Sequence, residues 1–177
     1  MIDALRRSLA RRAAARALRA RAPRPLRPSA GHRLAMVVLP EGLDDTKASW
    51  DALDSVGLDP ERVVAVAVHG VPYVPDRYAS RILSAAPSGL LRLPSAADRA
   101  AAWDAGPDVA INLLPPRDPS GALLVGASPA AIRVGYVDRR AEPFYDLLIG
   151  APGEARPGPA AVARMLLQVD PTLFRPS

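Results

Sequence analysis

Apolar runs and helical patterns alternate along the chain from residue 33 onward. Runs that are apolar at nearly every position and stop at Pro or Gly are typical of strands buried on both faces of a parallel sheet. Such runs predict five strands, and the shorter run 90–94 could add another. The five are residues 33–40, 62–70, 107–115, 131–137 and 144–150.

Segments with helix start and stop signals lie between these runs. Residues 44–57 predict a helix that Gly57 ends, and its N-cap is Asp44 or Asp45. Ser95 is the expected N-cap of a second helix, which extends to the next Gly. Further helices are predicted at residues 76–86, 118–128 and 158–170.

Strands that alternate with helices imply parallel pairing, with helices on both faces of the sheet. The sequence therefore predicts an α/β fold: a three-layer, Rossmann-like domain over residues 31–177, with a mostly parallel sheet of about five or six strands. A basic helix and a Pro-rich linker precede it in residues 1–30. The short step from 131–137 to 144–150 also leaves a hairpin open, which would make one edge of the sheet antiparallel.

Positive charge is concentrated at the start of the chain. The first 28 residues contain nine Arg and one acidic residue, whereas the rest contains 14 basic and 17 acidic residues, so the net charge of +5 comes from this segment. Strong helix formers without Gly or Pro predict a helix over residues 1–22, with a thin apolar stripe at Ile2, Leu5, Leu9 and Ala13. The side chains expected to contact an anionic partner are Arg6, Arg7, Arg11, Arg12, Arg16, Arg19 and Arg21.

Three interpretations of this Arg-rich helix are open. Its side chains could contact the phosphates of a nucleic acid, in a salt-sensitive way. They could lie on an anionic membrane surface, where each basic residue contributes about 1 kcal/mol, or the helix could be a solubilising extension. No run approaches the length of a transmembrane helix, so the sequence predicts a cytoplasmic protein, which membrane contact would make peripheral.

Several kinds of chemistry lack the residues that they need. The chain has no Cys, which excludes disulfides and thiolate sites. The segment "EGLDDT" after the first strand lacks the glycines of a dinucleotide loop, and the only Lys, Lys47, has no phosphate-loop spacing. Two His without HxH or HxxxH spacing predict no structural zinc site, so neither a metal nor a cofactor is expected. Asp44 and Asp45 could hold a magnesium ion, but an acidic first helical turn explains them better.

Four polar residues at or near predicted strand ends are candidates for ligand binding. Glu41 follows the first predicted strand and His69 ends the second, at the carboxyl edge where sites of α/β proteins form. A strand-end His without a GxSxG motif caps a sheet more often than it catalyses. Asn112 and Asp146 lie inside later runs, and each could face a crevice or could bond a neighbouring loop from a strand start.

The second half of the chain contains, in order, "PDVAINLL", "LLVGASPAAIRVGYV", "FYDLLIG" and a terminal helix with "ARMLLQV". This order resembles a bacterial family of uncharacterised proteins, domain of unknown function 6913. Its members have a basic N-terminal helix and strands of this kind. The family has no assigned activity, so the resemblance carries over no catalytic residue. The residues that carry it are Val109, Asn112, Ala127, Arg133, Val134, Gly135, Tyr145, Asp146, Leu147 and Ile149.

The same segments more distantly resemble the N-terminal half of heptosyltransferase-like glycosyltransferases, which need a second Rossmann-like domain to hold the nucleotide sugar. The sequence favours a non-catalytic interaction or scaffold protein, whose Arg-rich helix contacts an anionic partner, either RNA or a membrane surface. A protein partner is also possible for such a module. The alternative is a small enzyme or ligand-binding protein that uses the carboxyl ends of the strands near Glu41, His69 and Pro115. This alternative predicts a concave pocket at that edge.

Overall fold

The computed structural model describes most of the chain up to Gly150. The predicted helix at 158–170 and most of the Pro-rich linker lie outside the described residues. The described residues are 2–19, 25, 34–55, 57, 59–70, 73–116, 118–138 and 142–150.

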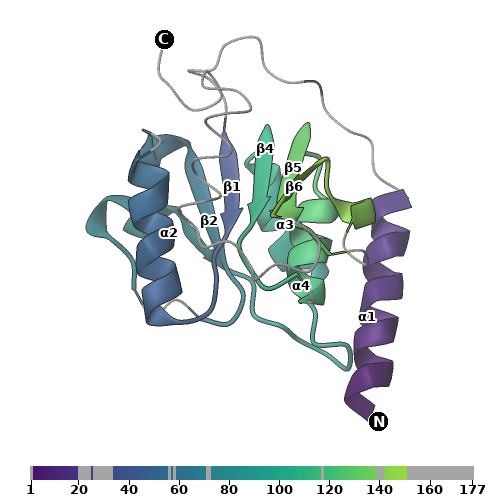
Figure 1. Cartoon of the computed structure of the whole chain (residues 1–177). Coiled ribbons are helices and arrows are strands. Elements are labelled where there is room, and N and C mark those ends of the chain that lie inside the picture. The colour runs from purple at the N-terminus through teal and green to yellow at the C-terminus, as the bar shows by residue number, and fades with distance from the viewer. Residues whose placement is uncertain are drawn as a thin grey trace.

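A six-stranded sheet forms the centre of the described structure, in the order β3-β2-β1-β4-β5-β6 (Figure 1). Every neighbouring pair of strands in this sheet is parallel. The Rossmann-like α/β fold predicted from the sequence is thereby confirmed. The strands are β1 (Ala35–Val38), β2 (Val63–Ala67), β3 (Ile82–Ser84), β4 (Val109–Asn112), β5 (Ile132–Tyr136) and β6 (Leu147–Ile149).

The third strand lies earlier in the chain than predicted. A 3₁₀ helix, η3 (Asp76–Arg81), runs directly into β3, so the predicted helix at 76–86 is wrong in its second half. The predicted strand at 90–94 is instead part of a tight loop, closed by an antiparallel bridge between Ser88 and Leu93. The strand escaped prediction because β3 is an edge strand with incomplete burial, and such a strand needs no continuous apolar run.

The last two strands do not form a hairpin. β6 is parallel to β5, with Val134 opposite Leu147, so the open possibility of an antiparallel edge is wrong. The connection passes through a 3₁₀ turn, η5 (Glu142–Phe144), and buries Phe144 and Tyr145 against the sheet. Parallel strands need such a crossover, whereas a tight hairpin turn can join only antiparallel ones.

One face of the sheet is covered by α2 (Leu43–Ser55) (Figure 1). Trp50 of α2 is fully buried there and stacks on Tyr78 of η3, with ring centroids 4.4 Å apart. The helix begins at Leu43, before both predicted N-caps, so Asp44 and Asp45 lie in its first turn rather than at the N-cap. Their acidic charge still favours the helix N-terminus electrostatically.

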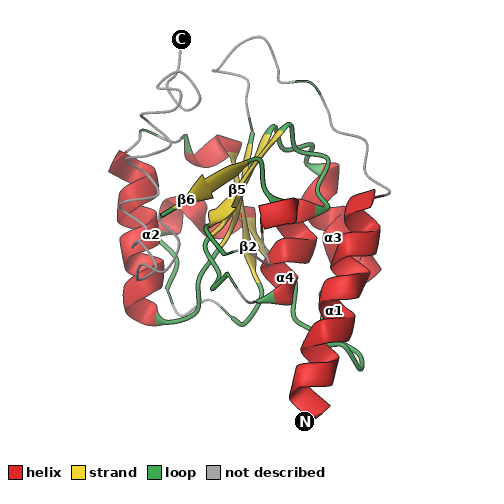
Figure 2. Ribbon diagram, turned by 45° about the vertical axis from the view of Figure 1, so that its right-hand side comes forward, coloured by secondary structure: helices red, strands yellow, loops and turns green. Residues whose placement is uncertain are grey.

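The opposite face is covered by three helical segments (Figure 2). The first is α3 (Ala96–Asp104), where Ser95 and Asp98 form the reciprocal hydrogen bonds of a capping box, which confirms Ser95 as the N-cap. The second is α4 (Pro119–Gly121), which continues as the π-helical η4 (Ala122–Gly126). The third is the N-terminal helix α1 (Ile2–Arg19).

The N-terminal helix packs on the domain through alanines. Ala10 and Ala14 of α1 are 1% and 0% exposed and lie in the same apolar cluster as residues of η4, and α1 also contacts α4. Leu9, part of the predicted apolar stripe, is 40% exposed instead. Small side chains four residues apart let two helices approach closely, so the packing face of α1 is its alanine face. A helix face made of alanines does not stand out in a pattern of large apolar residues, so the sequence did not predict it.

Candidate functional site

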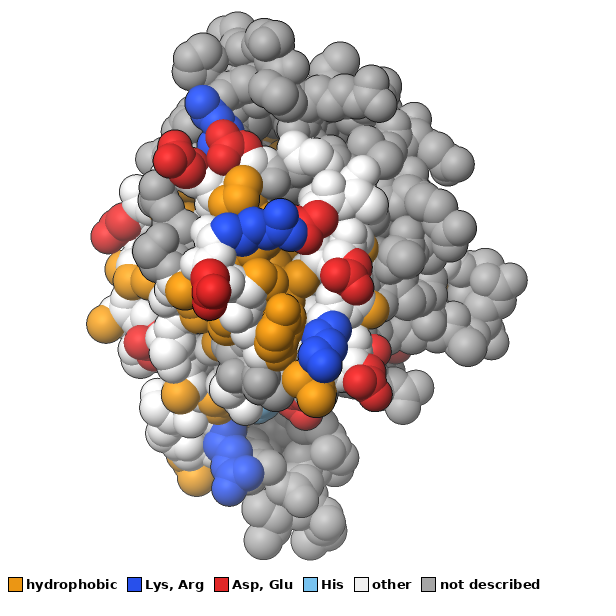
Figure 3. All heavy atoms as spheres, turned by 90° about the vertical axis from the view of Figure 1, so that its left-hand side faces the viewer, with side chains coloured by type: hydrophobic (Ala, Val, Ile, Leu, Met, Phe, Trp, Pro, Cys, Tyr) orange, Lys and Arg blue, Asp and Glu red, His pale blue; other side chains and the backbone are white. Residues whose placement is uncertain are grey.

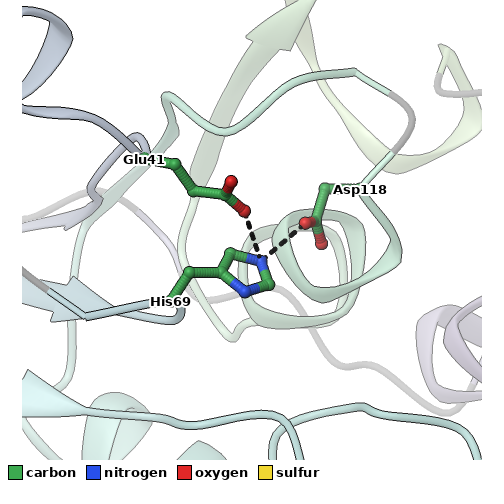
Figure 4. A group of neighbouring side chains, drawn as sticks. All are labelled: Glu41, His69 and Asp118. Atoms are coloured by element: carbon green, nitrogen blue, oxygen red, sulfur yellow. Dashed lines mark hydrogen bonds and ion pairs between the residues drawn. The ribbon is translucent and has the colours of Figure 1, made fainter.

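The order of the strands creates a crevice at one place on the carboxyl edge. Chain connections leave β1 in one direction and β4 in the other, so the strand order reverses between these neighbours. Open α/β sheets bind ligands outside the carboxyl ends of the strands at such a point. Glu41, His69 and Asp118 follow β1, β2 and β4 respectively and meet there (Figure 4).

The three side chains converge on one imidazole nitrogen. Nε2 of His69 lies 3.0 Å from Oε1 of Glu41 and 2.9 Å from Oδ2 of Asp118. One side-chain atom from each residue, an imidazole nitrogen or a carboxylate oxygen, lies within 4.8 Å of the other two. The side chain of Asp118 is 15% exposed, that of His69 is 31% exposed and that of Glu41 is 55% exposed. The cluster is therefore anchored on its Asp118 side and open on its Glu41 side.

One nitrogen cannot serve two carboxylates equally well. Nε2 of an imidazole carries either one proton or one lone pair. A proton there can point straight at only one of the two carboxylate oxygens, and a lone pair would face both negative groups. In the described part of the chain, each of these carboxylates has His69 as its ion-pair partner. The arrangement thus favours a cationic species at the point where the three groups meet.

The carboxylate of Asp118 is held in place by the helix that it begins. Asp118 is the N-cap of α4, and its Oδ1 accepts a hydrogen bond of 2.7 Å from the backbone N–H of Ser120. Its other oxygen, Oδ2, is the one that meets His69. The N-cap bond fixes the rotation of the side chain, so the approach of Oδ2 to His69 is set by the local fold.

A pocket of about 520 Å³ opens beside the cluster. Its walls combine polar groups with apolar carbon, and they come from the segment after β2, the loop before α3, the start of α4 and the helix α1. The lining residues are Ala10, His69, Pro87, Leu91, Arg92, Asp118, Pro119 and Ser120. The segment 90–94, which the sequence offered as a possible strand, and the N-terminal helix α1 therefore both help to build this pocket.

Arg92 lies in the pocket wall with an unusual backbone. Its φ is +49°, in the left-handed region that residues with a Cβ rarely adopt. The tight loop imposes this conformation, because the N–H of Arg92 bonds the carbonyl of Gly89 and Ser88 pairs with Leu93. Strained residues of this kind occur preferentially at ligand sites.

Asn112 ends β4 near this edge, but its amide is used inside the protein. Its Nδ2 donates to the hydroxyl of Tyr145 at 2.7 Å, and its Oδ1 accepts from the N–H of Leu114 at 3.0 Å. Burial raises the pKa of Tyr145 far above its usual value, although the hydrogen bond from Asn112 acts in the opposite direction. The phenol thus stays protonated, and Asn112 fixes the chain rather than contacting the pocket.

Asp146 lies at the other edge of the sheet. It precedes β6, and its Oδ2 accepts hydrogen bonds from the Nε and the backbone N–H of Arg133, at 2.7 and 2.9 Å. The guanidinium is buried and also donates to the carbonyl of Gly126. Of the two possibilities predicted for Asp146, a strand-start residue bonded to a neighbouring segment is the one observed.

The Arg residues of the N-terminal helix are described only in part. Arg12, Arg16 and Arg19 are exposed on α1. The side chains of Arg6, Arg7 and Arg11 lie outside the described residues, as does Arg21. No helix in the described part of the chain is long and apolar enough to cross a membrane.

Sequence reasoning missed Asp118 and Arg92. Glu41 and His69 were found because both directly follow buried parallel strands. Asp118 comes six residues after the end of β4 and 49 residues after His69, so no local spacing joins it to them. The one signal in the sequence is an acidic residue before "PSG" at the start of a short helix, which is typical of an N-cap.

The fold and the cluster define a class: a Rossmann-like α/β protein with a polar site at the switch point of its sheet. No family model, no curated protein and no solved structure matches the chain. The resemblances to domain of unknown function 6913 and to heptosyltransferase-like enzymes therefore stay predictions. The proposals below rest on the geometry of the site.

Proposed function

We propose that this protein binds a small polar molecule in the pocket at the carboxyl edge, with His69 as a group that contacts it. The observation that carries the proposal is the position of His69, which lines the pocket and meets carboxylates from two other segments. The alternative predicted from the sequence, a small enzyme or ligand-binding protein at the strand ends, is thus the function that the geometry favours.

Size and lining support this proposal. Ligand pockets commonly measure about 300–1,000 Å³ and combine apolar walls with a few converging polar groups, and a pocket of about 520 Å³ with His69, Arg92, Asp118 and Ser120 in its wall fits that description. The imidazole of His69 can donate or accept a hydrogen bond, so it can contact a polar ligand directly. A ligand with a polar end near His69 and an apolar part near Leu91 suits the lining.

The two His of the chain allow a direct test. The full protein, labelled with ¹³C, is titrated with nucleotides, sugar phosphates and short carboxylic acids while the imidazole signals are recorded by NMR. Substitution His69→Gln assigns the two signals. A ligand of the pocket moves the His69 signal in a saturable way and leaves the His32 signal in place. Equal movement of both signals, or none with any compound, would contradict the proposal.

Adjacent leucines provide a matched pair of variants for the same titration. Leu91 lines the pocket, whereas the neighbouring Leu90 is 87% exposed. Leu91→Trp should fill the pocket and abolish the saturable shift of His69. Leu90→Trp adds the same side chain outside the pocket, so it should leave the shift unchanged. If both variants bind as the original protein does, the ligand lies elsewhere.

As a second function, we propose that the outer face of α1 contacts an anionic partner, either RNA or an anionic membrane surface. The observation that favours it is the packing of α1, which buries Ala10 and Ala14 and leaves Arg12, Arg16 and Arg19 exposed. These Arg residues are spaced four and three apart, so they share one side of the helix. On the side of the molecule where α2 lies, acidic and basic side chains are instead interspersed (Figure 3). We also propose that the protein is cytoplasmic, and that it lies at the membrane surface if its partner is a membrane.

Substitution tests this second proposal better than deletion of the helix, because α1 also walls the pocket. A variant with Arg12→Ser, Arg16→Ser and Arg19→Ser should lose at least tenfold in affinity for single-stranded RNA or for vesicles rich in phosphatidylserine, and the loss should shrink as salt rises. The control, Arg62→Ser with Arg77→Ser and Arg99→Ser, removes equal charge from the domain body. Equal effects of the two variants would contradict a role for α1.

A further inference from the structure

We propose that Glu41, His69 and Asp118 hold a divalent transition-metal cation, bound by Oε1, Nε2 and Oδ2, at the mouth of the pocket. The inference deepens the proposed function, since the cation would provide a binding point for the ligand. It goes against the expectation from the sequence that the chain holds no metal. That expectation rested on the spacing of the His residues, whereas this site depends on segments brought together by the sheet.

The distances fit a single ion. Transition-metal ions bind imidazole nitrogen and carboxylate oxygen at about 2.0–2.2 Å, so neighbouring ligand atoms at right angles around one ion are about 3 Å apart. The separations of 3.0 Å from Nε2 to Glu41 and 2.9 Å from Nε2 to Asp118 agree with such a set. The Glu41 and Asp118 ligand atoms lie within 4.8 Å of each other, and both face the same imidazole nitrogen (Figure 4).

The charges favour a cation over a proton. Two carboxylates and a neutral imidazole carry two negative charges, which one divalent ion neutralises while it serves all three groups at once. A proton on Nε2 supplies one positive charge and one well-directed hydrogen bond. Glu41 also places a carboxylate just before α2, at the turn where dinucleotide-binding proteins hold a pyrophosphate, and a negative side chain there disfavours phosphate.

The three ligands are supported by neighbouring strands of one sheet. β1, β2 and β4 are adjacent strands of one sheet, and the ligands follow their ends. Asp118 is further oriented by the N–H of Ser120, and such bonds to the free oxygen of a ligating carboxylate strengthen metal sites. The ligands are thus held near one another before an ion arrives, which lowers the cost of binding it.

The donor set indicates the kind of ion. One imidazole and two carboxylates without sulfur suit Zn²⁺, Mn²⁺ or Fe²⁺ and disfavour soft ions such as Cu⁺. Three protein ligands leave at least one position open for water or a ligand, as in catalytic rather than structural zinc sites. The open side of the cluster is that of Glu41, whose side chain is the most exposed of the three.

Metal titration of the full chain tests the inference without any ligand. After EDTA treatment and dialysis, calorimetry with ZnCl₂ and with MnCl₂ should give one equivalent of ion bound per chain. Paramagnetic Mn²⁺ should broaden the imidazole signal of His69 long before that of His32. Absence of stoichiometric binding for both ions, or equal broadening of the two signals, would overturn the site.

Single substitutions identify the ligands. Glu41→Gln, His69→Gln and Asp118→Asn should each weaken Zn²⁺ binding at least tenfold, while circular dichroism reports that the fold is kept. The matched controls are Glu61→Gln, which changes an exposed acid on the 3₁₀ helix η2 (Pro60–Arg62), and His32→Gln. Binding by the three variants that equals binding by the controls would overturn the assignment.

The two proposals for this edge fail separately. Stoichiometric metal binding with no compound that moves the His69 signal would keep the metal site and remove the ligand pocket. A saturable ligand shift in protein treated with EDTA, with no metal bound, would keep the pocket and remove the metal site.

Discussion

Acidic side chains lie at both edges of the parallel sheet, but they have different partners. At the amino edge, Asp146 accepts three hydrogen bonds from Arg133, and Asp108 accepts one from the N–H of Leu34. At the carboxyl edge, Glu41 and Asp118 both meet Nε2 of His69. Donors are abundant at the first edge, whereas two carboxylates share one nitrogen at the second.

The ratio of donors to acceptors separates a structural acid from a functional one. Asp146 and Arg133 form a complete charged pair with two parallel bonds, and such a pair has little capacity left for a ligand. The carboxyl-edge cluster has more negative charge than its own partner can satisfy, and it opens into a pocket. Burial alone would not identify the functional acid, because the side chain of Asp118 is less exposed than that of the structural acid Asp146. The predictions below test the difference, from the largest expected effect to the smallest.

Asp146→Asn should cause the largest loss of stability. The substitution removes the charge that balances the buried guanidinium of Arg133, whose side chain is 8% exposed. A buried charge left without its partner costs several kcal/mol, and because the Asp146 side chain is 39% exposed we expect the lower part of that range, about 2–3 kcal/mol of unfolding free energy. Urea unfolding followed by circular dichroism measures it. A change as small as that of Asp104→Asn, on the exposed end of α3, would contradict a structural role.

High pH should also destabilise the fold through Tyr145, the residue before Asp146. Its pKa is raised by burial, and its hydroxyl is bonded to Asn112 at the carboxyl end of β4. In the unfolded chain the phenol loses its proton near pH 10, while in the folded protein it keeps it. Stability is therefore full below pH 10 and falls above it, by about 1.4 kcal/mol per pH unit for each such group.

The variant Tyr145→Phe separates this effect from general alkaline unfolding. Burial also raises the pKa of Tyr78, so the original protein should lose stability through both groups above pH 10. Tyr145→Phe loses its bond to Asn112 at neutral pH, but it should show a shallower fall between pH 10 and 11. Tyr78→Phe is the parallel control. Slopes that match the original protein in both variants would show that neither phenol is linked to folding.

Backbone strain distinguishes the edges as well. The left-handed residue that precedes β4 at the amino edge is Gly106, whereas the pocket loop holds Arg92 in that conformation. Gly adopts it without a steric cost, and a residue with a Cβ does not. Arg92→Gly should therefore be more stable than Arg92→Ala by about 1 kcal/mol in urea unfolding. Both variants should lose ligand affinity alike, because both remove the side chain from the pocket.

The central strands and half of the site could be predicted from the sequence for one reason. β1, β2 and β4 are buried at every position, so each appears as a continuous apolar run, and the next polar residue marks the carboxyl edge. Glu41 and His69 followed from that rule. The edge strand β3 did not, because its residues are incompletely buried and its sequence also fits a helix.

The remaining residues of the site are placed by tertiary structure that no local sequence pattern predicts. Asp118 reaches His69 from the N-cap of α4, where its backbone N–H bonds the carbonyl of Pro115. Ala10 reaches the pocket because α1 packs through alanines, which have little weight in a hydrophobic pattern. Arg92 is placed by a tight turn between Ser88 and Leu93, within a run whose apolar residues suggested a strand.

Asp118→Asn should have the smallest effect on stability, and it is the same change as Asp146→Asn at the opposite edge. Asn keeps the Oδ1 acceptor for the N–H of Ser120, and Asn and Asp are equally good N-caps. It also removes one of two negative charges that face each other across His69, so in protein treated with EDTA we expect unfolding free energy to stay within about 0.5 kcal/mol, or to rise. With Zn²⁺ present, the original protein should gain stability by mass action and the variant should not. A loss as large as that of Asp146→Asn in the metal-free protein would make Asp118 a structural acid and would remove the difference between the two edges.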